Sequence, residues 1–239
     1  MAEAELGKIR INKYLAECGV CSRRGADELI DKGAVIVDGV PASRGMKIEP
    51  GMEVKVNGKV ISGMDEKVYL AFNKPRGIVC TSEKMEERNV IDYLNYPIRI
   101  TYSGRLDKDS EGLLIMTNDG DLIDSMMRSR NDHEKEYLVT VDRTITDAVL
   151  YKMSKGVFLE DLGVTTKRCT ITRVTERSFS IILTQGLNRQ IRRMCQAFGY
   201  RVRKLVRKRV MNVELGDLPV GEYRKLTDKE IEGIKKGIR

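Results

Sequence analysis

Histidine is almost absent from this chain of 239 residues, which contains only His133. A zinc site made of several histidines is therefore excluded, and a Ser-His-Asp triad has a single candidate histidine. The five cysteines are an odd number, which argues against a disulfide framework and for reduced thiols. Cys18 and Cys21 form one CxxC motif without a second pair, so the sequence predicts no metal site there.

Long apolar runs are also missing. No segment approaches the roughly 20 apolar residues that a membrane-spanning helix needs. The first residues, Met1 to Glu5, lack the charged and then apolar layout of a secretion signal, so we expect a cytoplasmic protein. Hydrophobic residues make up 41% of the chain, which is ordinary for a globular protein and allows a sizeable core. The length fits one large domain or two unequal ones.

Acidic residues are fewer than basic ones, 35 against 43, which gives a net charge of +8. Such an excess favours a polyanionic partner. The segment from Asn188 to Arg209 has no acid and nine basic residues: Arg189, Arg192, Arg193, Arg201, Arg203, Lys204, Arg207, Lys208 and Arg209. A run of like charge is often only a solvated face. Next to a reactive site, it would instead contact phosphates.

The amino-terminal part of the chain has the pattern of a separate module. Apolar spacing predicts a short helix around Ile9 to Leu15, and a second helix from Arg23 to Lys32 that Ser22 caps. Two strands are predicted after them, from Ala34 and from Val54. We predict domains at residues 1–62 and 68–239, with a polar, glycine-containing linker at 63–67.

The second domain is predicted to alternate strands and helices. The expected strands are Val68–Phe72, Leu113–Thr117, Glu136–Val141, Cys169–Val174 and Ser178–Thr184. The expected helices are Asn89–Leu94, Asp121–Met127, Asp147–Lys155 and Asn188–Phe198, and a capping box at Thr227 predicts a terminal helix.

A tight loop with one carboxylate precedes the apolar run that starts at Leu113. Gly104 and Gly112 allow backbone conformations that a side chain would forbid, so the loop can bring Arg105 and Asp107 together. A neighbouring guanidinium favours the ionised carboxylate, which suits a nucleophile or a base and not a proton donor. A surface turn with a solvated ion pair is the alternative reading. The loop lacks the Gly-Lys-Ser/Thr ending of a phosphate loop, which disfavours nucleotide hydrolysis.

Three motifs in order resemble one family of enzymes. The loop Gly104-Arg105-Leu106-Asp107, the strand that begins Lys135-Glu136-Tyr137, and the block from Ile182 to Met194 are similar to the catalytic loop, tyrosine strand and late strand-turn-helix of pseudouridine synthases. The segment Phe72 to Gly77 resembles their opening strand and turn. The resemblance is to the branch that contains RsuA, RluB, RluE and RluF, and to RluF-like members in particular.

The resemblance implies the chemistry and its residues. Pseudouridine formation breaks the C1′–N1 bond of a uridine, turns the uracil and rejoins it through C5, so no cofactor or metal is expected. Asp107 is implied as the nucleophile at C1′ or as the base that removes a ribose proton, Arg105 as its partner, and Tyr137 as a ring against the flipped base. The implied substrate pocket contains Ile182, Leu183, Leu187, Arg189 and Arg192. Many relatives have Arg or Lys where this chain has Leu187, so we expect Arg189 or Arg192 to supply that charge.

The first domain resembles a small RNA-binding module that is shared with a ribosomal protein. Arg23 and Arg24 begin a helix, where backbone N–H groups and side chains together can hold phosphate. The implied RNA-binding residues are Arg10, Asn12, Lys13, Ser22, Arg23, Arg24, Arg193, Arg203 and Lys204. An ordinary accessory domain is the alternative. The implied fold is α+β: this small module, followed by a mixed, mainly antiparallel sheet flanked by helices.

Several functional readings stay open from the sequence. The resemblance favours a uridine of large-subunit (23S) ribosomal RNA, with small-subunit ribosomal RNA or transfer RNA as alternatives, and an enzyme of ribosome biogenesis. A monomer is the default expectation. A non-catalytic RNA-binding assembly factor would explain the charge equally well, but not the loop with Asp107. A hydrolase that uses Asp107 and His133 is a further alternative.

Overall fold

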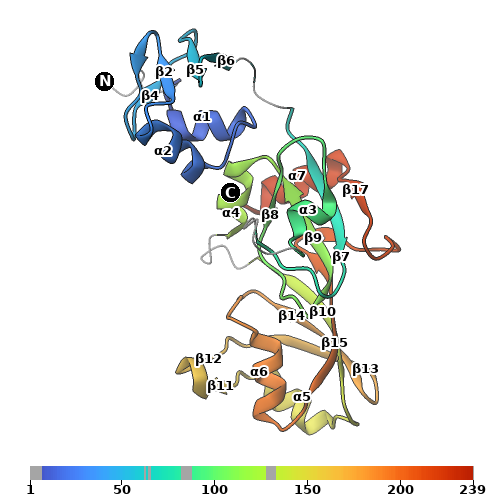
Figure 1. Ribbon diagram of the computed structural model, residues 1–239. Helices are drawn as coiled ribbons and strands as arrows, with labels where there is room; N and C mark the ends of the chain where they lie inside the picture. Colours follow the sequence, from blue (N-terminus) through green and yellow to red (C-terminus); the bar gives the residue numbers. More distant parts are fainter. Residues whose placement is uncertain (1–6, 62, 64–65, 82–87, 128–132, 239) are drawn as a thin grey trace. The chain divides into compact units, whose positions relative to one another are not determined.

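A computed structural model describes residues 7–61, 63, 66–81, 88–127 and 133–238 (Figure 1). The chain divides into two compact units. One contains Met1–Lys67 with Tyr96–Ile100 and Asn118–Gly120, and the other contains Val68–Asn95, Thr101–Thr117 and Asp121–Arg239. In the described part of the chain, every helix is too short or too polar to cross a membrane.

The first unit packs two helices against small sheets. The helices are α1 (Ile11–Glu17) and α2 (Arg23–Asp31). A four-stranded sheet has the order β3-β2-β5-β6, with β2 at Val35–Val37, β3 at Val40–Pro41, β5 at Val54–Val56 and β6 at Lys59–Ile61. A second pair joins β1 (Ile9–Arg10) to β4 (Lys47–Ile48). As predicted, Ser22 caps α2, since its hydroxyl accepts a hydrogen bond from the Gly25 amide at 2.9 Å.

The second unit is built on a nine-stranded sheet. Its main order is β13-β14-β10-β15-β9-β7-β17, while β8 pairs with β9 and β16 with β15. The strands are β7 (Tyr69–Lys74), β8 (Thr101–Ser103), β9 (Glu111–Thr117), β10 (Lys135–Val141), β13 (Thr170–Thr175), β14 (Ser178–Leu183), β15 (Val202–Val210), β16 (Val213–Glu214) and β17 (Tyr223–Lys225). Described pairs of this sheet are antiparallel except β9 with β15. The predicted α+β class with a mixed, mainly antiparallel sheet is confirmed.

Among the described residues, five α-helices flank this sheet. They are α3 (Val90–Leu94), α4 (Gly120–Met127), α5 (Asp147–Ser154), α6 (Gln190–Ala197) and α7 (Asp228–Gly237). A short hairpin of β11 (Phe158–Leu159) and β12 (Val164–Thr165) contacts α6. The predicted capping box of α7 is present at Thr227 and Glu230.

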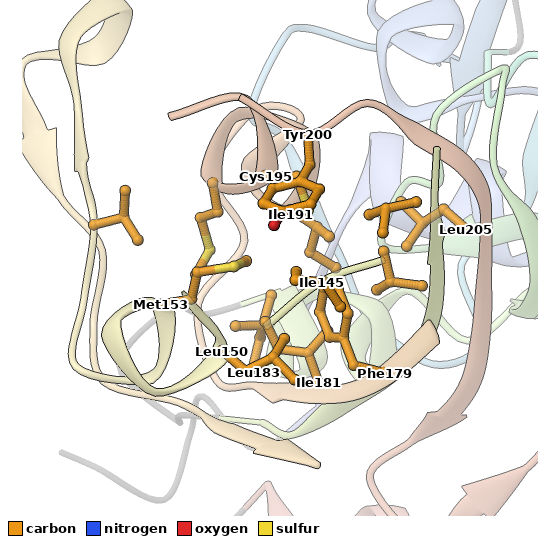
Figure 2. Packing of buried hydrophobic residues seen from close by; sticks show 14 of the residues in the cluster. Ile145, Leu150, Met153, Phe179, Ile181, Leu183, Ile191, Cys195, Tyr200 and Leu205 are labelled. Atoms are coloured by element: carbon orange, nitrogen blue, oxygen red, sulfur yellow. The ribbon is translucent and has the colours of Figure 1, made fainter. Parts of the chain in front are cut away.

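Strand β15 serves two cores because successive side chains of a strand face opposite sides. Leu205 belongs to a core that α5 and α6 cover, together with Ile145, Phe179 and Ile191 (Figure 2). The next residue, Val206, belongs to a second core with residues of β9, α4 and α7. The sequence did not predict this strand, since charged residues outnumber apolar ones in Val202–Val210.

Candidate active site

The loop between β8 and β9 presents Asp107 on a fixed backbone. Gly104 and Gly112 adopt φ angles of 75° and 112°, as the glycine positions predicted. The Gly77 amide donates a hydrogen bond to the Lys108 carbonyl at 2.7 Å, which holds the middle of the loop. The Asp107 side chain remains 33% exposed. A substrate can therefore reach this carboxylate.

Arg189 provides positive charge beside the carboxylate. Its Nη1 lies 3.9 Å from Oδ2 of Asp107 and 3.6 Å from Oδ2 of Asp109. Arg189 precedes α6 with a left-handed φ of 50°, a conformation that costs a non-glycine residue roughly 1–2 kcal/mol. Helix α6 consequently begins at Gln190, two residues later than the sequence predicted.

Arg105 requires a correction to the expected pairing. Its side chain is exposed, and among the described residues Arg105 makes no ion pair with Asp107. The intervening Leu106 is only 6% exposed, so its side chain turns inward and the Arg105 side chain lies on the solvent side of the loop. Arg189, and not Arg105, is the cation that accompanies Asp107.

Arg192 fastens α6 to the same loop. Its Nη2 donates to the Asp109 carbonyl at 3.0 Å and to the Ser110 hydroxyl at 3.3 Å. Its Nε is buried and has no hydrogen-bond partner in the described structure. Burial, and then the nearby charge of Arg189, lower the pKa of Arg192 below its usual value. The Arg192 side chain therefore positions the loop, and it places a second guanidinium next to Arg189.

Arg207, which sequence reasoning did not single out, supports the loop from within the sheet. This residue of β15 is 2% exposed and lies opposite Gly112 in the parallel pair with β9. Its Nε donates to the Leu113 carbonyl at 2.6 Å, and its Nη1 donates to the Arg105 carbonyl at 3.3 Å. It thereby holds both ends of the loop. Arg207 lies in a run of basic residues that the sequence predicts to be exposed. No pattern in the sequence distinguishes it from the exposed arginines and lysines of that run.

Lys74 is a second buried cation near this loop. It is 0% exposed and lies opposite Gly112 in the antiparallel pair of β7 with β9. Its Nζ donates to the carbonyls of Pro75 and Ile78, both at 2.8 Å. Burial lowers the pKa of Lys74 to about 8. The sequence placed Lys74 in a family-like turn but gave no sign of its burial.

The pKa of Lys74 predicts how stability depends on pH. Between pH 8 and the usual lysine value near 10.5, the unfolded chain binds more protons at this residue than the folded one, so stability rises with pH across that window. In Lys74→Met we expect this rise to shrink by an amount on the order of 2 kcal/mol. Urea unfolding at pH 7.5, 9 and 10 measures it; equal pH dependence in both proteins would contradict the prediction.

Tyr137 lies in register with these groups. It is opposite Ile181 of β14 on one side and opposite Arg207 of β15 on the other. The ring is partly buried against the core beneath α5 and α6. The sheet thus orders Tyr137, Arg207, Gly112 and Lys74 along one row across four strands. Two of the three motifs are brought together through this row.

The predicted apolar wall divides between two faces. Leu183 is 4% exposed and belongs to the core with Ile181. Ile182, between them on β14, faces the other side of the sheet. Leu187 packs partly buried against the same core as Leu183. Ile182 and Leu183 therefore cannot form one wall, because neighbouring strand residues point in opposite directions.

Family models account for most of the chain. Residues 68–197 match the model described as RNA pseudouridylate synthase, and this match alone exceeds half of the chain. The chain belongs to this family. It is therefore an isomerase that acts on RNA, as the sequence predicted. Residues 9–54 match the S4 domain.

Relatives and a solved structure agree with this assignment. The synthase is 50% identical to "Dual-specificity RNA pseudouridine synthase RluF" of Escherichia coli (strain K12), over 96% of this chain and 79% of that protein. It is 33% identical to "Ribosomal large subunit pseudouridine synthase B" of Bacillus subtilis (strain 168), over 95% of each chain. A crystal structure of a pseudouridylate synthase matches with a TM-score of 0.69 and 28% identity, over 95% of this chain and 99% of the other. The predicted branch of the family is confirmed.

The S4 unit of the synthase carries six of the predicted RNA-binding residues. Arg10, Ser22, Arg23 and Arg24 are exposed. Asn12 and Lys13 are half-buried: the Asn12 amide donates to Asp27 at 3.0 Å, and Lys13 lies 4.0 Å from Glu17. The S4 match supports binding of RNA by this unit.

The remaining predicted RNA-binding residues of the synthase differ in whether their charged groups already have partners within the protein. Arg193 donates to the Asp161 carboxylate and, at 3.1 Å, to the Asn188 carbonyl. Lys204 lies 3.3 Å from Glu111. Arg203 is exposed. The basic segment is therefore not one continuous phosphate-binding surface.

The contacts of Arg193 predict a small effect of its removal. We expect Arg193→Ala to change RNA affinity by less than about twofold, since its guanidinium already pairs with Asp161. Loss of this partly exposed ion pair should cost at most about 1 kcal/mol of stability. Filter binding and thermal unfolding measure the two effects. A tenfold loss of affinity would show that Arg193 leaves Asp161 to bind RNA.

Proposed function

We propose that this synthase converts a specific uridine of large-subunit (23S) ribosomal RNA to pseudouridine, with Asp107 as its reactive group. The observation that carries the assignment is the accessible Asp107 carboxylate on a fixed loop, next to the Arg189 guanidinium. The name of the Bacillus subtilis relative supports the large ribosomal subunit as the source of the substrate.

The isomerisation needs few groups from the protein. Cleavage of C1′–N1 and formation of C1′–C5 move the uracil, while a proton leaves C5 and another is added at N1. Asp107 acts at the ribose, either as the nucleophile at C1′ or as the base for a ribose proton. Arg189 keeps a positive charge at this carboxylate. Because target atoms inside a stacked helix are out of reach, the uridine must first be flipped out, and Tyr137 offers it a ring.

A second RNA class is supported by the names of relatives. The Escherichia coli and Salmonella typhi proteins, at 50% and 51% identity, are both called dual-specificity synthases. We therefore include transfer RNA and small-subunit ribosomal RNA among the substrates to be tested. On this proposal the synthase works in the cytoplasm during ribosome biogenesis, as a monomer with an RNA-binding domain at 1–62, a linker at 63–67 and a catalytic domain at 68–239.

The test is direct detection of the product. Purified synthase is incubated with unmodified 23S, 16S and transfer RNA transcripts, and pseudouridine is mapped by carbodiimide-dependent reverse-transcription stops. We expect a new stop in 23S RNA that is absent with Asp107→Asn. Stops confined to another RNA would correct the substrate. Tight binding with no stop in any RNA would favour the assembly-factor alternative.

Replacement of His133 distinguishes the synthase from the alternative of a hydrolase that uses Asp107 and His133. This residue is 7% exposed, and its Nε2 lies 3.3 Å from the Ser125 carbonyl oxygen, so it is a core residue. We expect His133→Ala to keep turnover within about tenfold of the wild type, through a loss of stability only. Loss of all turnover in a folded His133→Ala protein would contradict the assignment of Asp107 as the sole reactive group.

A further inference from the structure

An arginine-lined pocket opens beside the proposed active site. It has a volume of about 480 Å³, within the usual range of ligand sites, and lies where α6 ends and β15 begins. The lining residues are Arg189, Arg192, Gln196, Gly199, Tyr200, Arg201 and Val202. None of these seven is acidic. We call this cavity the arginine pocket.

The positive charge of the arginine pocket is only partly balanced. In the described structure the Arg201 guanidinium is exposed and makes no hydrogen bond or ion pair. The buried Nε of Arg192 also has no partner. Among the arginines of this lining, Arg189 is the one that lies within 4 Å of carboxylates in the described structure, at 3.6 and 3.9 Å. An anion that enters would gain charge-assisted hydrogen bonds and would reduce the repulsion between the cations.

The wall of the arginine pocket is rigid. The Arg201 amide donates to Oδ1 of Asp142 at 3.0 Å, and the Asp142 amide donates to the Arg201 carbonyl at 3.0 Å. The preceding Tyr200 is 8% exposed and places its ring in the core above Cys195 (Figure 2). The backbone of Arg201 is therefore held in a fixed position, while its guanidinium is available to bind an anion.

The chemistry of the lining selects the ligand. Guanidinium groups bind phosphate through paired N–H donors, and a pocket without an exposed aromatic ring offers a base no surface for stacking. We propose that the arginine pocket binds one backbone phosphate of the substrate RNA, that of the target uridine or its immediate neighbour. Arg189 lines the pocket and also lies 3.9 Å from Asp107, so this phosphate is one side chain away from the reacting ribose. The assignment rests on the proposed function.

A phosphate held at this point would have a specific part in the isomerisation. Once the C1′–N1 bond is broken, the uracil must turn while the ribose stays in place. The ribose is then still attached to the protein-bound RNA through its backbone phosphates. A rigid arginine pocket that holds one of these phosphates also holds the ribose in place. Arg201 is accordingly a positioning residue for the RNA, and its removal should act on binding more than on the chemical step.

The experiment compares Arg201→Ala, Arg201→Lys and the control Arg177→Ala, which removes an exposed arginine from the turn between β13 and β14. The probe is an unmodified 23S RNA transcript, titrated at 50 to 200 mM salt. For Arg201→Ala we expect about tenfold weaker binding and a salt-dependence slope smaller by about one. Arg201→Lys should recover the slope, because a lysine keeps the charge. Arg177→Ala should match the wild type.

Single-turnover kinetics provide the second measurement. Arg201→Ala should raise the enzyme concentration for half-maximal rate by about tenfold, with less than about threefold change in the maximal rate. Equal affinity and salt slope in Arg201→Ala and wild type would overturn the phosphate site. A wild type that modifies no RNA would overturn the proposed function alone, because the salt slopes are measured by binding and need no turnover.

Discussion

Asp107→Asn should abolish pseudouridine formation while RNA binding persists. An amide is nearly the same size as the carboxylate but is neither a nucleophile nor a base, so we expect a rate loss of at least about a thousandfold. Asp107 is 33% exposed and lies beside Arg189, so its replacement leaves no buried charge without a partner. Removing a negative charge near the phosphates should leave RNA affinity within about threefold. Carbodiimide mapping measures turnover, and filter binding measures affinity.

Asp109→Asn is the matched control. Asp109 shares Arg189 with Asp107, at 3.6 Å, but its side chain is 55% exposed and its backbone carbonyl is the group that Arg192 holds. We expect Asp109→Asn to retain turnover within about tenfold of the wild type. Measurable turnover in Asp107→Asn would contradict the mechanism. Equal losses in the two variants would mean that the charge around Arg189, and not the Asp107 carboxylate itself, is required.

Gly112→Ala should destabilise the catalytic unit by at least about 3 kcal/mol. An added Cβ would lie 2.4 Å from the carbonyl oxygen and 2.6 Å from the backbone nitrogen of Arg207, and the φ of 112° is unfavourable for any side chain. Backbone atoms of a central strand cannot move aside easily, so the pairing of β9 with β15 would open. For a unit of this size we expect the melting temperature to fall by roughly 6–12 °C.

Gly186→Ala is the matched control for this change. A Cβ at Gly186 would meet no heavy atom within 4 Å. Its melting temperature should stay within about 2 °C of the wild type. Thermal unfolding followed by circular dichroism compares the three proteins. A Gly112→Ala protein with the melting temperature of the wild type would show that β9 and β15 do not lie close enough to exclude a side chain at this position.

Local features of the fold were accessible from the sequence because their causes are local. Ser22 and Thr227 predict the starts of their helices because they cap them. The glycines on either side of Asp107 predict a tight loop. The three motifs around Asp107, Tyr137 and Arg189 were enough to identify the family from the sequence. Most predicted helices and strands of the second unit agree with the structure to within one or two residues.

Features that depend on distant parts of the chain were not accessible. Strand β15 has the composition of a charged surface, and only the sheet around it explains why Arg207 is buried. Lys74 is likewise buried by a strand partner. The sequence offered Arg105, Arg189 and Arg192 as cations for Asp107, and the choice of Arg189 among them depends on where α6 begins relative to the loop. Each of these contacts joins segments that no local pattern connects.

The aspartate loop, Gly104 to Gly112, depends on a strand that is synthesised late, because Arg207 of β15 donates a hydrogen bond to the Arg105 carbonyl of this loop. The hydrogen bond from Arg207 to the Leu113 carbonyl joins residues that are 94 positions apart, and β15 is the strand that completes the sheet on one side of the aspartate loop. Ribosomes make the chain from its amino terminus, so the aspartate loop is synthesised several seconds before its support, at about 5–20 residues per second. The S4 unit of a growing chain is therefore made before the strand that supports Asp107, so on the proposed mechanism uridine modification has to wait until synthesis has passed Arg207.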